Sequence, residues 1–109
     1  MAYSETLADR IHELLADRVD VTQRQMFGGL AFMVGGHMAC GVVGDELMLR
    51  LGEEGADAAL GEQHVRPMDF TGRPMRTMVF VEPAGISQEA DLRRWINRAV
   101  QHAKSLPPK

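Results

Sequence analysis

Residues 25–51, QMFGGLAFMVGGHMACGVVGDELMLRL, decide the fold of this chain. Two apolar runs flank the Gly-Gly pair at 35–36, which takes the positive φ angles of a tight hairpin turn readily. The Gly-Asp pair at 44–45 then separates the second run from a third, residues 46–51, whose alternation places three leucines on one face. The stretch therefore predicts a three-stranded antiparallel meander.

Helical periodicity appears on either side of the meander and again at the end of the chain. Ser4 is suited to cap a first helix, which we expect to end near Arg18. Residues 52–61 are rich in Ala and Glu and predict a short helix bounded by glycines. Ser87 is placed to cap a last helix, with apolar residues at three- and four-residue intervals and prolines at 107–108 to close it.

A second hairpin is predicted between the short helix and the last helix. Residues 65–70 and 75–82 have strand character and flank a turn at 71–74. Pro67 restricts the first of these strands to a sheet edge or to a short length. The order is α-β-β-β-α-β-β-α, which predicts a two-layer α+β domain with helices packed on an antiparallel sheet.

Both faces of the first two meander strands are apolar. Two sets of side chains alternate there: Leu30, Phe32 and Val34 with Phe27, Ala31 and Met33. Either the sheet is covered on both sides or one face meets another molecule. Seven methionines lie in or beside the predicted strands: Met26, Met33, Met38, Met48, Met68, Met75 and Met78. Because methionine fills cores and also suits adaptable interfaces, we expect some of them at a contact surface, which favours a homodimer or a partner-binding module.

The motif MFGG at 26–29, the Gly-Gly turn after it and the segment GDELMLR at 44–50 resemble the N-terminal domain of the TfoX (Sxy) family. Founding members of that family regulate bacterial competence. The resemblance covers nearly the whole chain and implies an α-β(3)-α-β(2)-α fold, similar to bacterial secretion chaperones and small YjbR-like proteins. Competence regulators usually carry a second, helical domain, so we expect residues 1–109 to form a stand-alone domain. The family has no agreed catalytic residues, so the motif residues mark the fold only.

Length and composition fit a single domain in the cytoplasm. A chain of 109 residues with 45% hydrophobic residues supports one core. The net charge of -3 and the pI near 5.7 give no general attraction to nucleic acid or anionic membranes. There is one cysteine, no signal-peptide pattern, and no apolar run of the roughly 20 residues that would cross a bilayer.

Cys40 and the four histidines are the candidates for nucleophilic or metal chemistry. On a strand, His37 and Cys40 are expected on opposite faces, which makes them a poor chelating pair, and we expect no metal or cofactor. An ordinary buried thiol is favoured for Cys40, which lies in an apolar strand. A catalytic Cys-His pair remains an alternative because it depends on approach in space.

The Gly-Gly pairs at 28–29 and 35–36 do not have the context of a phosphate-binding loop. Neither is followed by Lys-Ser or Lys-Thr, and neither opens a predicted helix. We interpret 35–36 as a turn and 28–29 as a bulge or a place where a helix packs closely.

Six arginines in two groups are candidate contacts for an anion or a partner. Arg66, Arg73 and Arg76 surround the second hairpin, where two Arg-Pro-Met triplets are expected to bring guanidinium groups near one turn. The second group lies on the polar side of the last helix, where cations also complement the helix dipole: Arg93, Arg94 and Arg98, followed by Lys104.

The sequence thus favours a non-catalytic regulatory or protein-interaction module, linked to transcription or competence regulation through its resemblance. One alternative is a nucleic-acid-associated regulator that uses the arginine clusters. Another is a small enzyme that uses Cys40.

Overall fold

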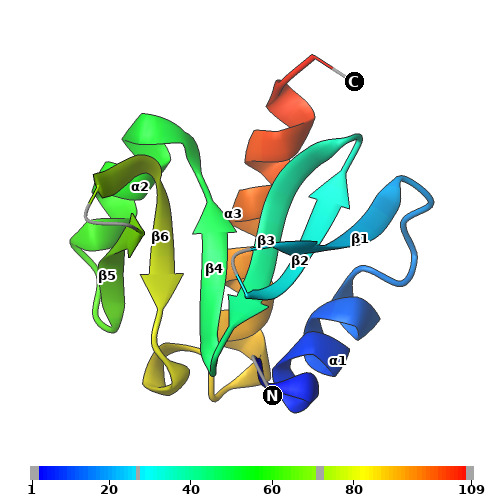
Figure 1. The fold of residues 1–109 in the computed structure, drawn as a ribbon, viewed down its shortest axis with the longest axis horizontal. Helices are drawn as coiled ribbons and strands as arrows, with labels where there is room; N and C mark the ends of the chain where they lie inside the picture. Colours follow the sequence, from blue (N-terminus) through cyan, green and yellow to red (C-terminus); the bar gives the residue numbers. More distant parts are fainter. Residues whose placement is uncertain (1–2, 27, 71–72, 108–109) are drawn as a thin grey trace.

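The computed structural model describes residues 3–26, 28–70 and 73–107, with side chains over the same ranges except 69–70 and 73–75. Within these ranges, three α-helices pack on a six-stranded antiparallel sheet (Figure 1). The elements are α1 (Glu5–Leu14), β1 (Val21–Met26), β2 (Gly29–Val34), β3 (His37–Val43), β4 (Glu46–Arg50), α2 (Gly52–Leu60), β5 (Val65–Phe70), β6 (Arg73–Val81) and α3 (Glu89–Ser105), with a short 3₁₀ turn at Pro83–Gly85.

The strand order is β1-β2-β3-β4-β6-β5, so β1 and β5 form the two edges. The α+β class predicted from the sequence is confirmed, and Pro67 lies in an edge strand as expected. Four strands precede α2 where three were expected. The additional strand, β1, has a polar sequence without apolar alternation and pairs with β2 residue for residue from Val21 to Met26.

Glycines shape the turns of this sheet. Gly35 and Gly36 have φ angles of 59° and 87°, which confirms the predicted hairpin turn. Gly28 has a φ of 73° and belongs to the loop between β1 and β2, so it is a turn residue and not a bulge. Phe27 lies outside the described residues.

The helix termini differ from expectation at two places. Ser4 caps α1 as predicted, since its hydroxyl oxygen accepts a hydrogen bond from the Leu7 backbone N–H at 3.2 Å. α1 ends at Leu14 and not near Arg18, because residues 15–17 turn toward β1. α3 begins after Gln88, which has the extended backbone of an N-cap, and Ser87 is not the capping residue.

The main core lies between the helices and one face of the sheet. Leu47, Leu49 and Leu51 of the β4 segment all enter it, as the alternation predicted. All of the helical residues described as buried belong to this cluster, including Ile11 of α1, Ala59 of α2 and Trp95 of α3. Helix burial is therefore confined to one face of the sheet.

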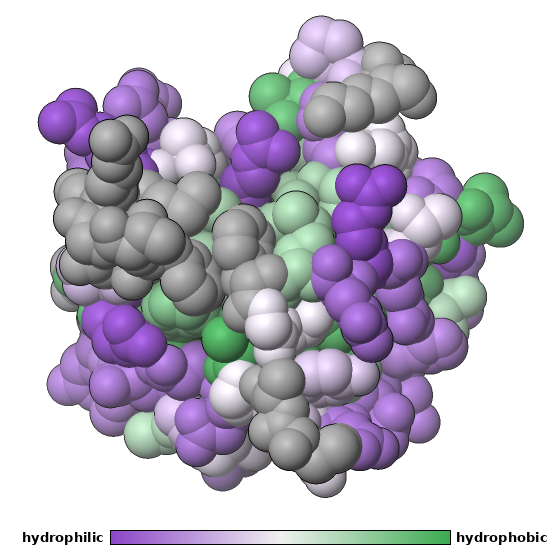
Figure 2. Space-filling model, viewed as in Figure 1, coloured by the Kyte–Doolittle hydropathy of each residue, from purple (hydrophilic) through white to green (hydrophobic). Residues whose placement is uncertain are grey.

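A second, smaller core covers the opposite face and is rich in methionine. Its buried members are Ala31, Met38, Met48, Met68, Met78 and Phe80, with Met26, Met33 and Val43 packed at its margin. Figure 2 views this side of the sheet and shows apolar surface at the centre between polar margins. The four buried methionines are at most 7% exposed and fill this core, whereas Met26 and Met33 are only partly buried, so a contact surface that includes some methionines stays a prediction; Met75's side chain lies outside the described part.

Candidate functional site

α3 presents two arginines against an aromatic ring. Arg94 and Arg98 are four residues apart and project from the same side of the helix. Their guanidinium carbons lie 4.8 Å and 4.5 Å from the centre of the Trp95 ring. Because Trp95 is only 1% exposed and is fixed in the main core, its ring orients both arginines through cation–π contacts.

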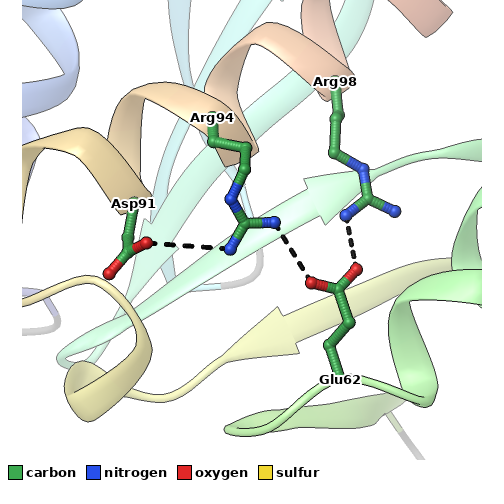
Figure 3. Close-up of polar contacts among 4 residues, drawn as sticks. All are labelled: Glu62, Asp91, Arg94 and Arg98. Carbon is green, nitrogen blue, oxygen red and sulfur yellow. Dashed lines mark hydrogen bonds and ion pairs between the residues drawn. The ribbon is translucent and has the colours of Figure 1, made fainter.

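Glu62, in the turn between α2 and β5, bridges the same two arginines (Figure 3). Its carboxylate accepts hydrogen bonds from Arg98 at 2.7 Å and from Arg94 at 3.1 Å. Asp91, one turn earlier on α3, lies 3.8 Å from Arg94. The hydrogen bond from Arg98, reinforced by Arg94, holds the pKa of Glu62 below its usual value. Nothing in the sequence indicated this role for Glu62, because it is 32 residues from Arg94.

A shallow depression of about 480 Å³ lies over the outer side of α3. Arg93 is exposed there, and within the described ranges no ion pair engages it. We call this surface the α3 platform; its lining residues are Ala90, Arg93, Arg94, Asn97, Arg98 and Gln101. The three arginines of α3 thus lie on one continuous surface, although the Glu62 carboxylate already pairs with two of them, Arg94 and Arg98.

The hairpin arginines do not assemble in the same way. Arg66 lies opposite Phe80, at the far end of the hairpin from its turn, so the expectation of guanidinium groups gathered near one turn is wrong for this residue. Two hydrogen bonds to Glu46 engage it, one of 2.8 Å from Nε, and its guanidinium carbon lies 4.6 Å from the centre of the Phe80 ring. Arg76 is exposed beside a groove of about 280 Å³ that acidic residues of α2 also line. The side chain of Arg73 lies outside the described part.

Cys40 is a free, fully buried thiol in the main core. Burial raises its pKa to about 12, so the thiol stays protonated at neutral pH and is a poor nucleophile. Between β2 and β3 the pairing passes from Phe32–Cys40 to Met33–Met38, which leaves Ala39 as an extra residue. This bulge turns His37 toward α3, the side on which Cys40 also lies, so the expected placement on opposite faces is wrong.

His37 and His102 both lie near the C-terminal end of α3. The Nε2–H of His37 donates a hydrogen bond to the Pro107 carbonyl oxygen, and its buried Nδ1 has no partner in the described part of the chain. The ring of His102 packs on Gly52, where an added Cβ would lie 2.7 Å from its Cε1. Burial lowers the pKa of His102, and the neighbouring Arg50 and His37 add to the effect.

This environment predicts a loss of stability in acid. The unfolded chain takes up a proton at His102 near pH 6.5, whereas the folded protein does so only at lower pH. The free energy of unfolding should therefore be fully retained above about pH 6.5 and fall as the pH drops below it. In urea titrations at pH 8 and pH 5.5, H102Q should lose less stability than the wild-type protein between the two conditions.

At pH 8 the side chain at 102 is neutral in both proteins. The difference between their free energies of unfolding at that pH therefore measures lost packing alone. An equal acid-induced loss in the two proteins would show that His102 does not carry the effect.

The described residues hold neither a metal-binding cluster nor a membrane-spanning helix. No group of three or more His, Cys, Asp or Glu side chains among them is arranged to hold a metal ion. None of the helices in these ranges combines the length and apolarity needed to cross a membrane.

The fold and the α3 platform together define a small α+β domain with one arginine-lined surface. The chain belongs to the TfoX N-terminal domain family, whose sequence model matches residues 13–103. The resemblance inferred from the glycine motifs is thereby confirmed. A comparison with curated proteins finds no match.

Proposed function

We propose that this domain is a non-catalytic regulatory module that acts in the cytoplasm by binding a protein partner through the α3 platform. The observation that carries the proposal is the fixed presentation of Arg94 and Arg98 by the Trp95 ring and Glu62. Side chains that are already ordered lose less conformational entropy when a partner binds.

The chemistry of the platform suits an acidic protein segment. A guanidinium group forms a two-pronged donor that matches a carboxylate, and Arg93 is exposed for such a contact. Nucleic acid is less well matched, because Trp95 is buried and offers no exposed ring on which bases stack, and because the chain carries a net charge of -3.

Two further considerations support a regulatory and non-catalytic role. The first is the likeness to competence regulators, which favours a link to transcription or competence. The second is burial of the Cys40 thiol, which raises its pKa to about 12 and makes it a poor nucleophile for the enzyme alternative.

The test is an affinity capture of the tagged protein from its own cell lysate, with and without nuclease, read by mass spectrometry. R93E reverses a charge at the centre of the platform, and K104E makes the same change at an exposed position of α3 outside it. We expect a partner whose recovery survives nuclease, falls about tenfold or more in R93E, and is retained in K104E.

Equal recovery by R93E and K104E would show that the platform is not the binding surface. Recovery that disappears with nuclease would instead favour the nucleic-acid alternative.

A further inference from the structure

β1 is an edge strand with little protection against pairing with another chain. It lies at the edge of the sheet (Figure 1), its four central residues, 22–25, are exposed, and it pairs with β2 without a bulge. The other edge strand, β5, carries Pro67 and a register shift, and packs against α2. Proline, bulges, covering elements and charged side chains are the devices that prevent an edge from pairing with another chain. β1 has no proline and no bulge along its six residues, and its one charged side chain is Arg24.

The hydrogen-bonding groups on the outer side of β1 follow from its pairing with β2. The Gly35 N–H donates to the Asp20 carbonyl oxygen at 3.0 Å, so Asp20 directs its backbone groups toward β2. Since these directions alternate along a strand, Thr22, Arg24 and Met26 face β2 and the residues between them face outward. The outward backbone groups belong to Val21, Gln23 and Gln25.

These positions limit how two copies of β1 can pair about a two-fold axis. In each hydrogen-bonded pair across the axis, both residues must have outward backbone groups, and such residues alternate along β1. The two-fold axis therefore passes through a residue position and not between two residues. An axis at Arg24 sets that cation against its own copy, which is unfavourable. An axis at Thr22 sets Thr22 against Thr22 and Arg24 against Asp20 of the other copy, both of which are favourable cross-strand pairs. An axis at Gln23 forms no charge pair.

The surface beside β1 offers room for an added strand. Val19, just before β1, is fully exposed and is the most exposed large apolar side chain among the described residues. A groove of about 470 Å³ separates α1 from β1, with Leu15, Val21 and Phe32 among its lining residues. Side chains on the helix side of an added strand would lie over this groove.

We propose that a second copy of this chain pairs with the outer edge of β1, antiparallel about a two-fold axis at Thr22, so that one sheet runs through both copies. Val21 and Gln23 exchange backbone hydrogen bonds across the axis, and each Asp20 faces Arg24 of the other copy. Asp20 is accessible for this contact, because its present ion pair with Arg18, at 3.3 Å, is partly exposed. An interface of this small size is expected to give a dimer that dissociates in the micromolar range.

The proposal is tested by sedimentation velocity of the purified protein from micromolar to millimolar concentration. The wild-type protein should form dimers as the concentration rises. Q23P removes an outward N–H while leaving the N–H groups that bind β2, and Q23A is its matched control. Q23P should be monomeric throughout this range, and Q23A should dimerise like the wild-type protein.

Charge reversal tests the register without proline. D20R and R24D should each weaken dimerisation about tenfold or more, and the double variant D20R/R24D should restore it. Far-ultraviolet circular dichroism confirms that each variant is folded, and the charge variants remain decisive if Q23P does not fold. A wild-type protein that stays monomeric, a Q23P dimer, or a double variant that is not rescued would overturn the proposal.

R93E should dimerise normally, because the α3 platform is a separate surface, so failure of the proposed function leaves this result unaffected.

Discussion

Replacement of Gly29 by alanine is expected to lower the free energy of unfolding by about 4 kcal/mol, or to prevent folding. An added Cβ at Gly29 would lie 2.1 Å from the backbone carbonyl oxygen of Val42 in β3. The position of the added Cβ is fixed by the backbone of β2, and the atom it meets belongs to the backbone of β3. No side-chain rotation relieves this clash, so β2 would have to move away from β3. Urea denaturation followed by circular dichroism measures the loss.

Two other glycines provide matched controls for this prediction. G61A should be neutral or slightly stabilising, because Gly61 has a φ of -80° and an added Cβ would meet nothing closer than 3.5 Å. G28A should cost about 1–2 kcal/mol, since Gly28 has open space around it but a positive φ. If G29A loses no more stability than G28A, β2 does not approach β3 as closely as the structure indicates.

Replacement of Trp95 by alanine is expected to cost about 4 kcal/mol, because it removes a large and fully buried side chain from the main core. It also removes the ring that orients Arg94 and Arg98, so partner binding should fall together with stability. Thermal and urea unfolding measure the first effect, and the affinity capture described above measures the second.

The double variant R94Q/R98Q separates these two effects. Because both arginines are partly exposed, their loss should cost only about 1–2 kcal/mol, while partner binding should fall as in the Trp95 variant. A larger loss of stability in R94Q/R98Q than in W95A would show that the ion pairs with Glu62, and not the aromatic ring, hold α3 in place.

Local patterns in the sequence predicted the local structure correctly where one residue type has one dominant conformational role. The Gly-Gly turn at 35–36, the Ser4 cap and the alternation in β4 were all predicted correctly. Each depends on the residue and its near neighbours in the chain. β1 was missed because a polar strand has no periodic signal, and its pairing with β2 is what makes it extended.

The candidate site also combines features that the sequence predicted with contacts that it did not predict. The sequence placed Arg93, Arg94 and Arg98 on the polar side of a helix, and the structure gathers them on one surface. The sequence could not indicate that Glu62 joins two of them, because that contact spans 32 to 36 residues. It likewise grouped Arg66 with the hairpin turn, whereas cross-strand register directs it to Glu46.

The family, the α+β class and most of the helices and hairpins follow from the sequence, because turn chemistry and apolar periodicity are properties of short segments. The folded structure was needed to show which face the methionines occupy, which arginines are already paired, and that a bulge at Ala39 sets His37 and Cys40 on one side. Strand register and packing bring together residues that are distant along the chain, and neither composition nor spacing specifies those contacts.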